Sequence, residues 1–258
     1  MADSTSWFDS DDLWRDLYPV LFGKERWERT PAGIDLLLSL VPIPAGGKIC
    51  DLCCGPGRHS LELARRGFRL TGVDRTAGYV EEARTRAAAE GLEIEFVVED
   101  MRRFLRPSAF DAAVNLFTSF GYFEDPADDL RVVENIHASL VPGGRFVMDL
   151  ASKEIVARGF RERDWSWIDE ERGTRMLEER KLVDGWAMIE NTWTLLGPGG
   201  ERVIRFSHRL YSGAELAGLL ERAGFEEVRM FGSLNGTPYD HKAQRLIAVG
   251  RKAVPRSA

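Results

Sequence analysis

The sequence has few residues that commonly bind metals, with four histidines and three cysteines among 258 residues. The cysteines, Cys50, Cys53 and Cys54, lie together, and no second pair completes the four convergent ligands that zinc requires. Disulfide geometry is too restrictive for such close neighbours. We therefore expect free, buried thiols and no metal site.

The sequence also lacks a long apolar run and a cluster of basic residues. No stretch approaches the length that crosses a membrane. The first residues, MADSTSWFDSDDLW, are acidic and polar, unlike a signal peptide. The formal net charge is −6, which argues against a nucleic-acid partner because such partners favour a basic face. We expect a cytoplasmic protein with no membrane or nucleic-acid partner.

Residues 48–76 carry the strongest pattern in the chain. A short apolar run predicts a buried strand, Gly55 and Gly57 predict a tight turn, and a helical pattern follows and stops at Gly67. A second alternating run ends at Asp74. This order of strand, glycine turn, helix and strand is typical of a site for an adenosine cofactor. The pattern ends with an acid about 20 residues after the glycines, as such sites do.

The glycine pattern is incomplete for a dinucleotide. Ser60 stands where the dinucleotide fingerprint has its third glycine, which lets the helix pack closely over a pyrophosphate. This difference disfavours a nicotinamide or flavin cofactor. An NAD(P)-dependent oxidoreductase is the less favoured alternative enzyme class.

Residues 51–57, DLCCGPG, resemble the first motif of class I S-adenosylmethionine-dependent methyltransferases. The family most often has glycine where this chain has Cys53, and it uses the backbone carbonyl there for the cofactor's amino group. The resemblance covers residues 33–150 well and the C-terminal part more loosely. It implies S-adenosyl-L-methionine as the methyl donor and S-adenosyl-L-homocysteine as the product.

The resemblance also implies where the cofactor would bind. Asp74 would accept the ribose hydroxyl protons, and Asp100 would take the adenine amino group while the N–H of Met101 meets the ring. The backbone of Asn115 and Leu116 would meet the methionine end. The predicted cofactor-binding residues are Asp51, Cys53, Gly55, Gly57, Asp74, Arg75, Asp100, Met101, Asn115 and Leu116.

Aromatic residues mark a candidate substrate site. Residues 110–117 read as an apolar strand, and the seven residues 117–123 include four aromatics. Open α/β sheets hold ligands at the carboxyl ends of their parallel strands, and aromatic faces favour a sulfonium cation. Each ring could instead fill the core. The predicted substrate contacts are Tyr18, Phe117, Phe120, Tyr122, Trp193 and Tyr211.

The patterns together predict an α/β fold with a Rossmann-like, seven-stranded, mostly parallel sheet and helices on both faces. Residues 1–44 would form a helical lid with helices over 9–21 and 33–40, the chain restarting at Pro31. Residues 45–150 would form the cofactor-binding core. Residues 151–211 would form an antiparallel insertion of three strands, at 175–183, 186–196 and 202–211, that roofs the site. Residues 212–258 would complete the core sheet.

The sequence thus predicts an S-adenosylmethionine-dependent methyltransferase that moves a methyl group to an N, O or C nucleophile of a small molecule by in-line displacement. A free amine would need no dedicated base. A hydroxyl would be helped by one, and His208 and His241 are the candidates, although the pattern favours a surface histidine over a base at each position. A non-catalytic protein that binds S-adenosylmethionine stays open, as do the acceptor and the oligomeric state.

Overall fold

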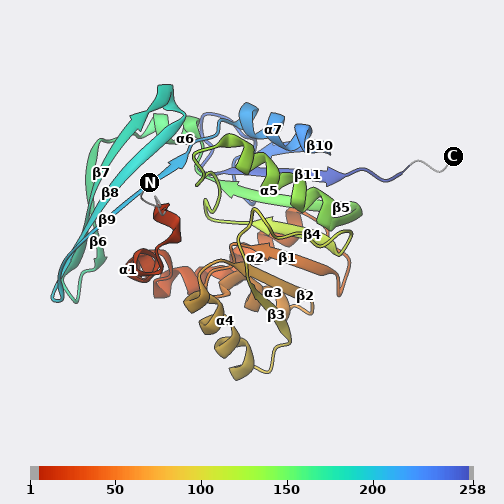
Figure 1. The fold of residues 1–258 in the computed structure, drawn as a ribbon, viewed down its shortest axis with the longest axis horizontal. Coiled ribbons are helices and arrows are strands. Elements are labelled where there is room, and N and C mark those ends of the chain that lie inside the picture. The colour runs from red at the N-terminus through yellow and green to blue at the C-terminus, as the bar shows by residue number, and fades with distance from the viewer. Residues whose placement is uncertain (1–5, 256–258) are drawn as a thin grey trace, which may run out of the picture.

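The computed structural model describes residues 6–255 and contains two β-sheets (Figure 1). The larger sheet has seven strands in the order β10-β11-β5-β4-β1-β2-β3, and all neighbours are parallel except where β11 pairs with β5 and β10. The predicted mostly parallel sheet is confirmed. Its strands are β1 (Lys48–Leu52), β2 (Arg69–Asp74), β3 (Ile94–Val98), β4 (Phe110–Asn115), β5 (Leu140–Leu150), β10 (Phe225–Phe231) and β11 (Leu246–Lys252).

Helices cover both faces of this sheet. Ile34, Leu37 and Leu63 join the core on one face, and Val133 and Leu216 join the core on the other. Burial of these apolar stripes is the main force that holds each helix to the sheet. The first face carries α2 (Lys24–Leu40), α3 (Arg58–Arg65) and α4 (Ala77–Ala89), and the second carries α5 (Pro126–Ser139) and α7 (Gly213–Arg222).

Helix α2 corrects the prediction for the N-terminal segment. We expected a helix only after Pro31, but α2 runs from Lys24 through that proline to Leu40. A proline inside a helix removes one hydrogen bond and costs about 3 kcal/mol. Here the buried face that includes Ile34 and Leu37 offsets this cost, since both side chains are almost fully inaccessible.

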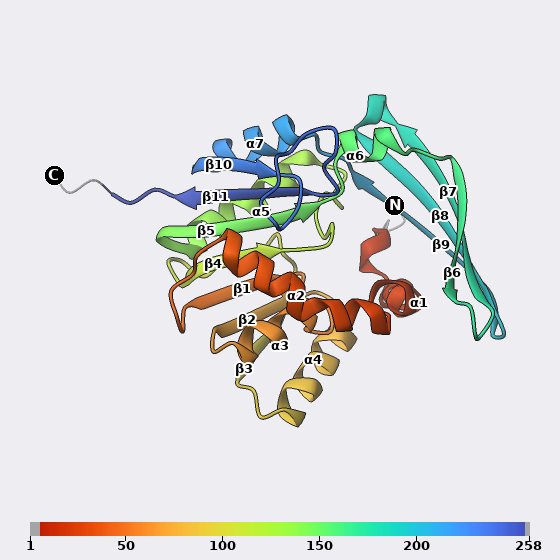
Figure 2. The same ribbon diagram turned by 180° about the vertical axis from the view of Figure 1, so that it is seen from behind.

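The second sheet stands at one end of the molecule (Figures 1 and 2). It is antiparallel and has four strands, so the prediction of three was wrong. The missed strand, β6, is an edge strand whose Trp165 and Trp167 are 56% and 44% exposed, so it contributes little to the core that strand patterns reflect. The sheet consists of β6 (Arg163–Asp169), β7 (Thr174–Val183), β8 (Met188–Gly197) and β9 (Gly200–Arg209).

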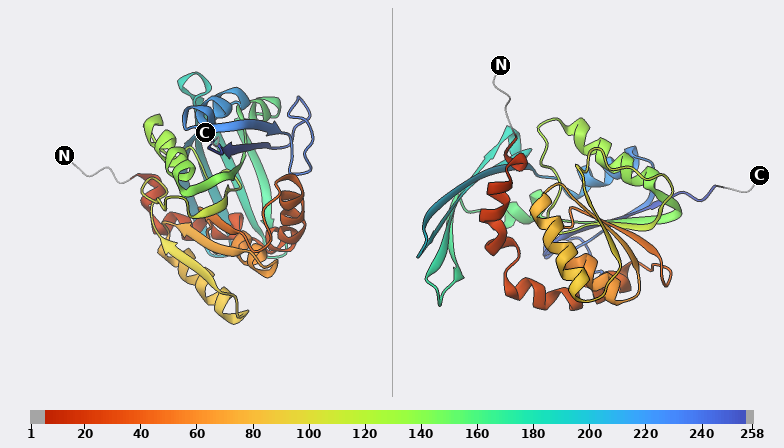
Figure 3. Two further views of the ribbon diagram at one scale, coloured as in Figure 1. Left: turned by 90° about the vertical axis from the view of Figure 1, so that its right-hand side faces the viewer. Right: turned by 60° about the horizontal axis from the view of Figure 1, so that its bottom comes forward.

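Four further helical segments complete the described fold. The N-terminal η1 (Trp7–Asp9) and α1 (Asp11–Leu21) lie between the second sheet and the central one (Figure 3). The side chain of Ser10 accepts a hydrogen bond from the N–H of Leu13 and caps α1. The remaining short helices are α6 (Lys153–Arg158) and η2 (Asp184–Trp186). Among the described residues, no helix is both long and apolar enough to cross a membrane.

Candidate active site

A cavity of about 360 Å³ lies where the carboxyl ends of the parallel strands face α1 and the second sheet. Gly55, Asp74, Asp100 and Leu116, which follow or end β1, β2, β3 and β4, all line it. Trp193 of β8 closes the opposite side. Residues from four predicted strand ends therefore meet at one edge of the sheet, as parallel topology requires.

The turn after β1 leaves no room for side chains. Gly55 has a φ of 55°, and a Cβ there would lie 2.9 Å from Cζ of Phe22. Gly57 has a φ of 81°, and its Cβ would lie 2.9 Å from that of Ala83. Both positions require glycine for conformation and for space. Gly55 lines the cavity together with Phe22, while Gly57 is covered by packing and is absent from the lining.

Asp51 supports the turn from below. Its Oδ2 accepts a hydrogen bond of 2.6 Å from the Ser60 hydroxyl, and the carboxyl is buried. Burial raises the pKa of Asp51 to about 6. Asp51 does not line the cavity described here. The structure therefore places it beneath the glycine turn.

Asp74 lies at the centre of the cavity wall. Its Oδ2 accepts from the N–H of Gly55 and its Oδ1 from the N–H of Thr76, both at 2.8 Å. Burial raises the pKa of Asp74. Each carboxylate oxygen has a second lone-pair site, so the group can still accept from a bound ligand.

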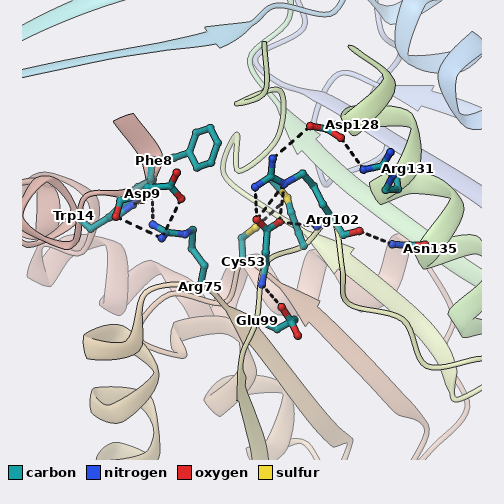
Figure 4. A network of polar contacts seen from close by, with 12 residues as sticks. Phe8, Asp9, Trp14, Cys53, Arg75, Glu99, Arg102, Asp128, Arg131 and Asn135 are labelled. Atoms are coloured by element: carbon teal, nitrogen blue, oxygen red, sulfur yellow. Dashed lines mark hydrogen bonds and ion pairs between the residues drawn. The ribbon is translucent and has the colours of Figure 1, made fainter. Parts of the chain in front are cut away.

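Asp100 is engaged by a neighbouring arginine. Nε of Arg102 lies 3.0 Å from Oδ2 of Asp100, and the N–H of Arg102 donates to Oδ1 at 2.8 Å. Burial alone would raise the pKa of Asp100, but the hydrogen bonds from Arg102 hold it below its usual value. Beside them, Sγ of Cys53 lies 3.5 Å from Sδ of Met101 (Figure 4). Asp100, Met101 and Cys53 all line the cavity.

Cys53 has a φ of 60°, in the left-handed region that favours glycine. This explains why the resembled family most often has glycine there. Burial raises the pKa of all three thiols, and the structure leaves them free. Across residues 6–255, no group of three His, Cys, Asp or Glu side chains is arranged to hold a metal ion.

The end of β4 is held by Asn115. Its Nδ2 donates to the carbonyl oxygens of Leu52 at 3.2 Å and Ser119 at 3.1 Å. The buried side chain thus joins the end of β1 to the loop after β4. Leu116 and Phe117 come next and line the cavity. Phe117 has a φ of 62° and is 46% exposed. Strained backbone of this kind is concentrated at ligand sites.

The sequence analysis missed a pair of arginines beside Phe117. The guanidinium carbon of Arg58 lies 4.4 Å from the ring centre of Phe117, and that of Arg26 lies 5.8 Å away. Neither arginine has a carboxylate partner among the ion pairs of the described residues. Burial, and after it the nearby Arg26, lower the pKa of Arg58 to about 10. The signal in the sequence was a basic residue directly after Gly57.

Arg75 connects the site to the N-terminal segment. It donates a hydrogen bond to the carbonyl oxygen of Phe8, and its Nη2 lies 3.1 Å from Oδ1 of Asp9 (Figure 4). Trp14 also donates to that carbonyl, at 2.9 Å. Arg75 lines the cavity but is occupied by η1. Its position thus fixes the covering segment over the cavity.

The predicted substrate contacts divide into two groups. Phe117, Tyr122 and Trp193 line the cavity. Phe120 and Tyr211 pack against each other in the core with ring centres 5.7 Å apart, and the Tyr211 hydroxyl donates to Asp129. Tyr18 donates to Glu82 outside the cavity lining.

The two candidate histidines lie in different places. His208 of β9 lines the cavity, and burial lowers its pKa to about 4. It is therefore neutral near pH 7. His241 is exposed in the last loop, where its carbonyl accepts from Arg158, and it is absent from the cavity lining. Of these two candidates, only His208 lines the cavity.

Residues 49–144 match a family model described as a methyltransferase domain. The comparisons support a class I S-adenosylmethionine-dependent methyltransferase. The predicted family, enzyme type and cofactor are confirmed at this level.

Two relatives of this methyltransferase show how far the similarity reaches. YqeM of Bacillus subtilis (strain 168), provisionally named a methyltransferase, is 24% identical over 82% of this chain and 86% of its own length. An S-adenosyl-L-methionine-dependent Diels-Alderase of Talaromyces variabilis is 28% identical over 74% of this chain, and the match spans 57% of that protein.

Solved methyltransferase structures share the fold. The CcbJ methyltransferase of Streptomyces caelestis superposes with a TM-score of 0.75 at 21% identity, covering 86% of this chain and 96% of that one. CalS10, an amino pentose methyltransferase of Micromonospora echinaspora solved with S-adenosylmethionine bound, gives a TM-score of 0.67 at 21% identity, covering 93% and 97%. At these identities the likeness shows the fold alone.

Proposed function

We propose that this methyltransferase moves the methyl group of S-adenosylmethionine to a small molecule held against the second sheet. One observation carries the proposal: a single cavity joins Asp74 and Asp100 at the strand ends to Trp193 and His208 on the second sheet. A cavity that reaches both sides can hold a donor and an acceptor together. The small-molecule substrate in the name of CalS10 supports this assignment.

The residues present fit the cofactor. Asp74 would accept the ribose hydroxyls with its free lone pairs, and Gly55, which lines the cavity, would lie against the amino-acid end. Asp100 and Met101 would hold the adenine after β3. When bound, the cofactor supplies an electrophilic methyl group, and the protein positions and desolvates the nucleophile.

The two arginines missed by sequence reasoning would hold the cofactor's carboxylate. Arg58 is a buried cation without an ion-pair partner in the described structure, and burial of an unpaired charge is costly. The exposed Arg26 lies beside it and likewise has no ion-pair partner among the described residues. A ligand carboxylate would remove that cost. Their place beside Leu116 and Phe117 is the end of the cavity assigned to the methionine part of the cofactor.

The net charge of the chain bears on the partner class. The net charge of −6 supports a small-molecule partner over nucleic acid, and a cytoplasmic location is part of the same proposal. Tyr122 and Trp193 are the proposed substrate contacts, since both line the cavity.

Calorimetry with S-adenosylhomocysteine and with NAD tests the cofactor site. We expect binding of the first and none of the second, and preference for NAD would contradict the proposal. Release of S-adenosylhomocysteine from S-adenosylmethionine, measured across a metabolite panel, then tests catalysis. Binding without turnover on any compound would favour the alternative of a non-catalytic protein.

A further inference from the structure

The chemistry of the acceptor can be read from the inner face of the second sheet, and this inference rests on the proposed function above. Asn191 of β8 pairs with Phe206 of β9, and Ile189 pairs with His208. All four line the cavity together with Trp193, two residues along from Asn191. Alternation along the strands thus turns one face of the sheet toward the ligand.

His208 lies where this face meets the loop after β4. The N–H of the next residue, Arg209, donates to the carbonyl of Gly121 at 2.6 Å. Gly121 has a φ of 87°, and a Cβ there would lie 2.7 Å from the carbonyl oxygen of Arg209. The glycine therefore lets the sheet approach the strand end closely. His208 is held beside the loop that would flank the transferred methyl group.

This end of the cavity has no free negative charge among the residues described. The lining carboxylates, Asp74, Glu99 and Asp100, all follow β2 or β3 at the cofactor end. The nearby cation Arg180 of β7 is paired with Glu178. A protonated amine would find no counter-ion here, and an unpaired charge in a buried site is costly.

Hydrogen-bond donors are present instead. Trp7 Nε1, Trp193 Nε1 and Asn191 Nδ2 are buried, and none has a partner within the described part of the chain. Most buried polar groups in proteins are paired, so three unpaired donors around one cavity indicate a ligand rich in acceptor oxygens.

The walls between these donors are aromatic. The ring centre of Trp7 lies 5.0 Å from that of Tyr122 and 5.7 Å from that of Phe206. The ring of Phe206 lies 4.8 Å from Trp193 and is nearly parallel to His208. Such walls favour a flat, largely apolar ring system.

We propose that the acceptor is an uncharged, oxygen-bearing ring compound methylated on a hydroxyl, with His208 as the general base. The hydroxyl oxygen forms a bond to the methyl carbon, the carbon–sulfur bond breaks with its electron pair remaining on sulfur, and the hydroxyl proton passes to His208. The imidazolium then returns this proton to solvent.

The protonation state of His208 supports this role. Burial lowers its pKa, and no charged group in the described structure adds to that shift. The ionisable side chains near it are Tyr122 from the loop after β4 and the paired Arg180 and Glu178 from β7. His208 therefore enters the reaction as a neutral imidazole with a free lone pair.

Calorimetry on the S-adenosylhomocysteine-bound protein tests the acceptor class. The probes are naphthols, hydroxyquinolines and flavonols, each compared with the analogue that has an aminomethyl group in place of the hydroxyl. We expect the hydroxyl compounds to bind at least 10-fold more tightly. Equal or tighter binding of the amines, or no binding of any hydroxyl compound, would overturn the inference.

The variant His208→Gln tests the base, with His241→Gln as the matched control in the exposed loop. We expect His208→Gln to lower kcat on a weakly acidic naphthol by about 100-fold or more with little change in KM, as loss of a general base does. A nitrophenol that is already ionised at pH 7 should lose far less. The control should behave as wild type.

Three results separate this inference from the function beneath it. Unchanged kcat for His208→Gln on the naphthol, or an equal loss of kcat on the ionised nitrophenol, would contradict His208 as the base. The proposed methyltransferase function would stand. Failure of the wild type to bind S-adenosylhomocysteine at all would remove the proposed function itself. Normal binding of that product by His208→Gln shows that the variant is folded.

Discussion

The Oδ2 atom of Asp74 accepts a hydrogen bond of 2.8 Å from the backbone N–H of Gly55. The bond joins the end of β2 to the glycine turn after β1 and so fixes two parts of the cavity wall to each other. The same carboxylate is the one proposed to hold the ribose. Its loss should therefore affect both the turn and the ligand.

We expect Asp74→Ala to weaken S-adenosylhomocysteine binding by about 1–3 kcal/mol, or roughly 5- to 150-fold, as loss of a charged hydrogen-bond partner does. Calorimetry measures this change. Asp111→Ala is the control, because Asp111 Oδ2 also accepts a 2.8 Å bond from a backbone N–H, that of Lys48, at the opposite end of the sheet. Equal affinities of the two variants would mean that the ribose lies elsewhere.

Arg58→Met should weaken the binding of the cofactor's amino-acid end and leave the binding of its adenosine end unchanged. We expect a loss of at least about 10-fold in affinity for S-adenosylhomocysteine, since a buried charge pair would be removed. Affinity for 5′-methylthioadenosine, which has no carboxylate, should stay within about twofold. Arg66 at the C-cap of the same helix pairs with Asp35 and Glu62 instead, so Arg66→Met should change neither affinity. A parallel loss for both ligands would argue against the carboxylate assignment.

Asp51→Asn should make the stability less dependent on pH. Burial raises the folded pKa of Asp51 to about 6, so its contribution is complete below the unfolded pKa of about 4 and is lost as pH rises through 6. Between pH 7.5 and pH 4, wild type should gain roughly 2–3 kcal/mol relative to the variant. Urea unfolding at the two pH values measures this, and the exposed Glu81→Gln should show no such difference.

Gly121→Ala should loosen the junction between the second sheet and the site. The new Cβ would meet the Arg209 carbonyl at 2.7 Å, and the left-handed backbone adds strain. Gly173→Ala shares the positive φ, 67°, but has open space around it. We expect Gly121→Ala to lower the free energy of unfolding by about 1–3 kcal/mol more than the control. Equal free energies of unfolding for the two variants, measured by thermal unfolding, would mean that the junction accommodates the added Cβ without strain.

Local patterns were enough to predict most of the central sheet. The alternation and glycine signals around β1, β2 and α3 are short-range, so they survive without tertiary information. In the structure, Ser212 caps the start of α7, and both hydrogen bonds of a capping box join it to Glu215. The same reasoning failed at Pro31 and at β6, where burial elsewhere and an exposed edge overrode local preference.

The candidate site was only partly visible in the sequence. Asp74 and Gly55 were found because their roles depend on backbone conformation and on strand ends. Arg26 and Arg58 were missed, since 31 intervening residues hide the fact that α2 and α3 place them beside one ring. Phe120 and Tyr211 could not be assigned to core or cavity before their packing was known.

The sequence by itself determined the strand–turn–helix–strand unit from β1 to β2, the need for glycine after β1 and the family, because these depend on neighbours along the chain. Only the tertiary structure decided that His208 faces the cavity while His241 does not, and that three donors there lack partners in the part of the chain described. Such facts depend on contacts between residues far apart in sequence, which no local pattern encodes.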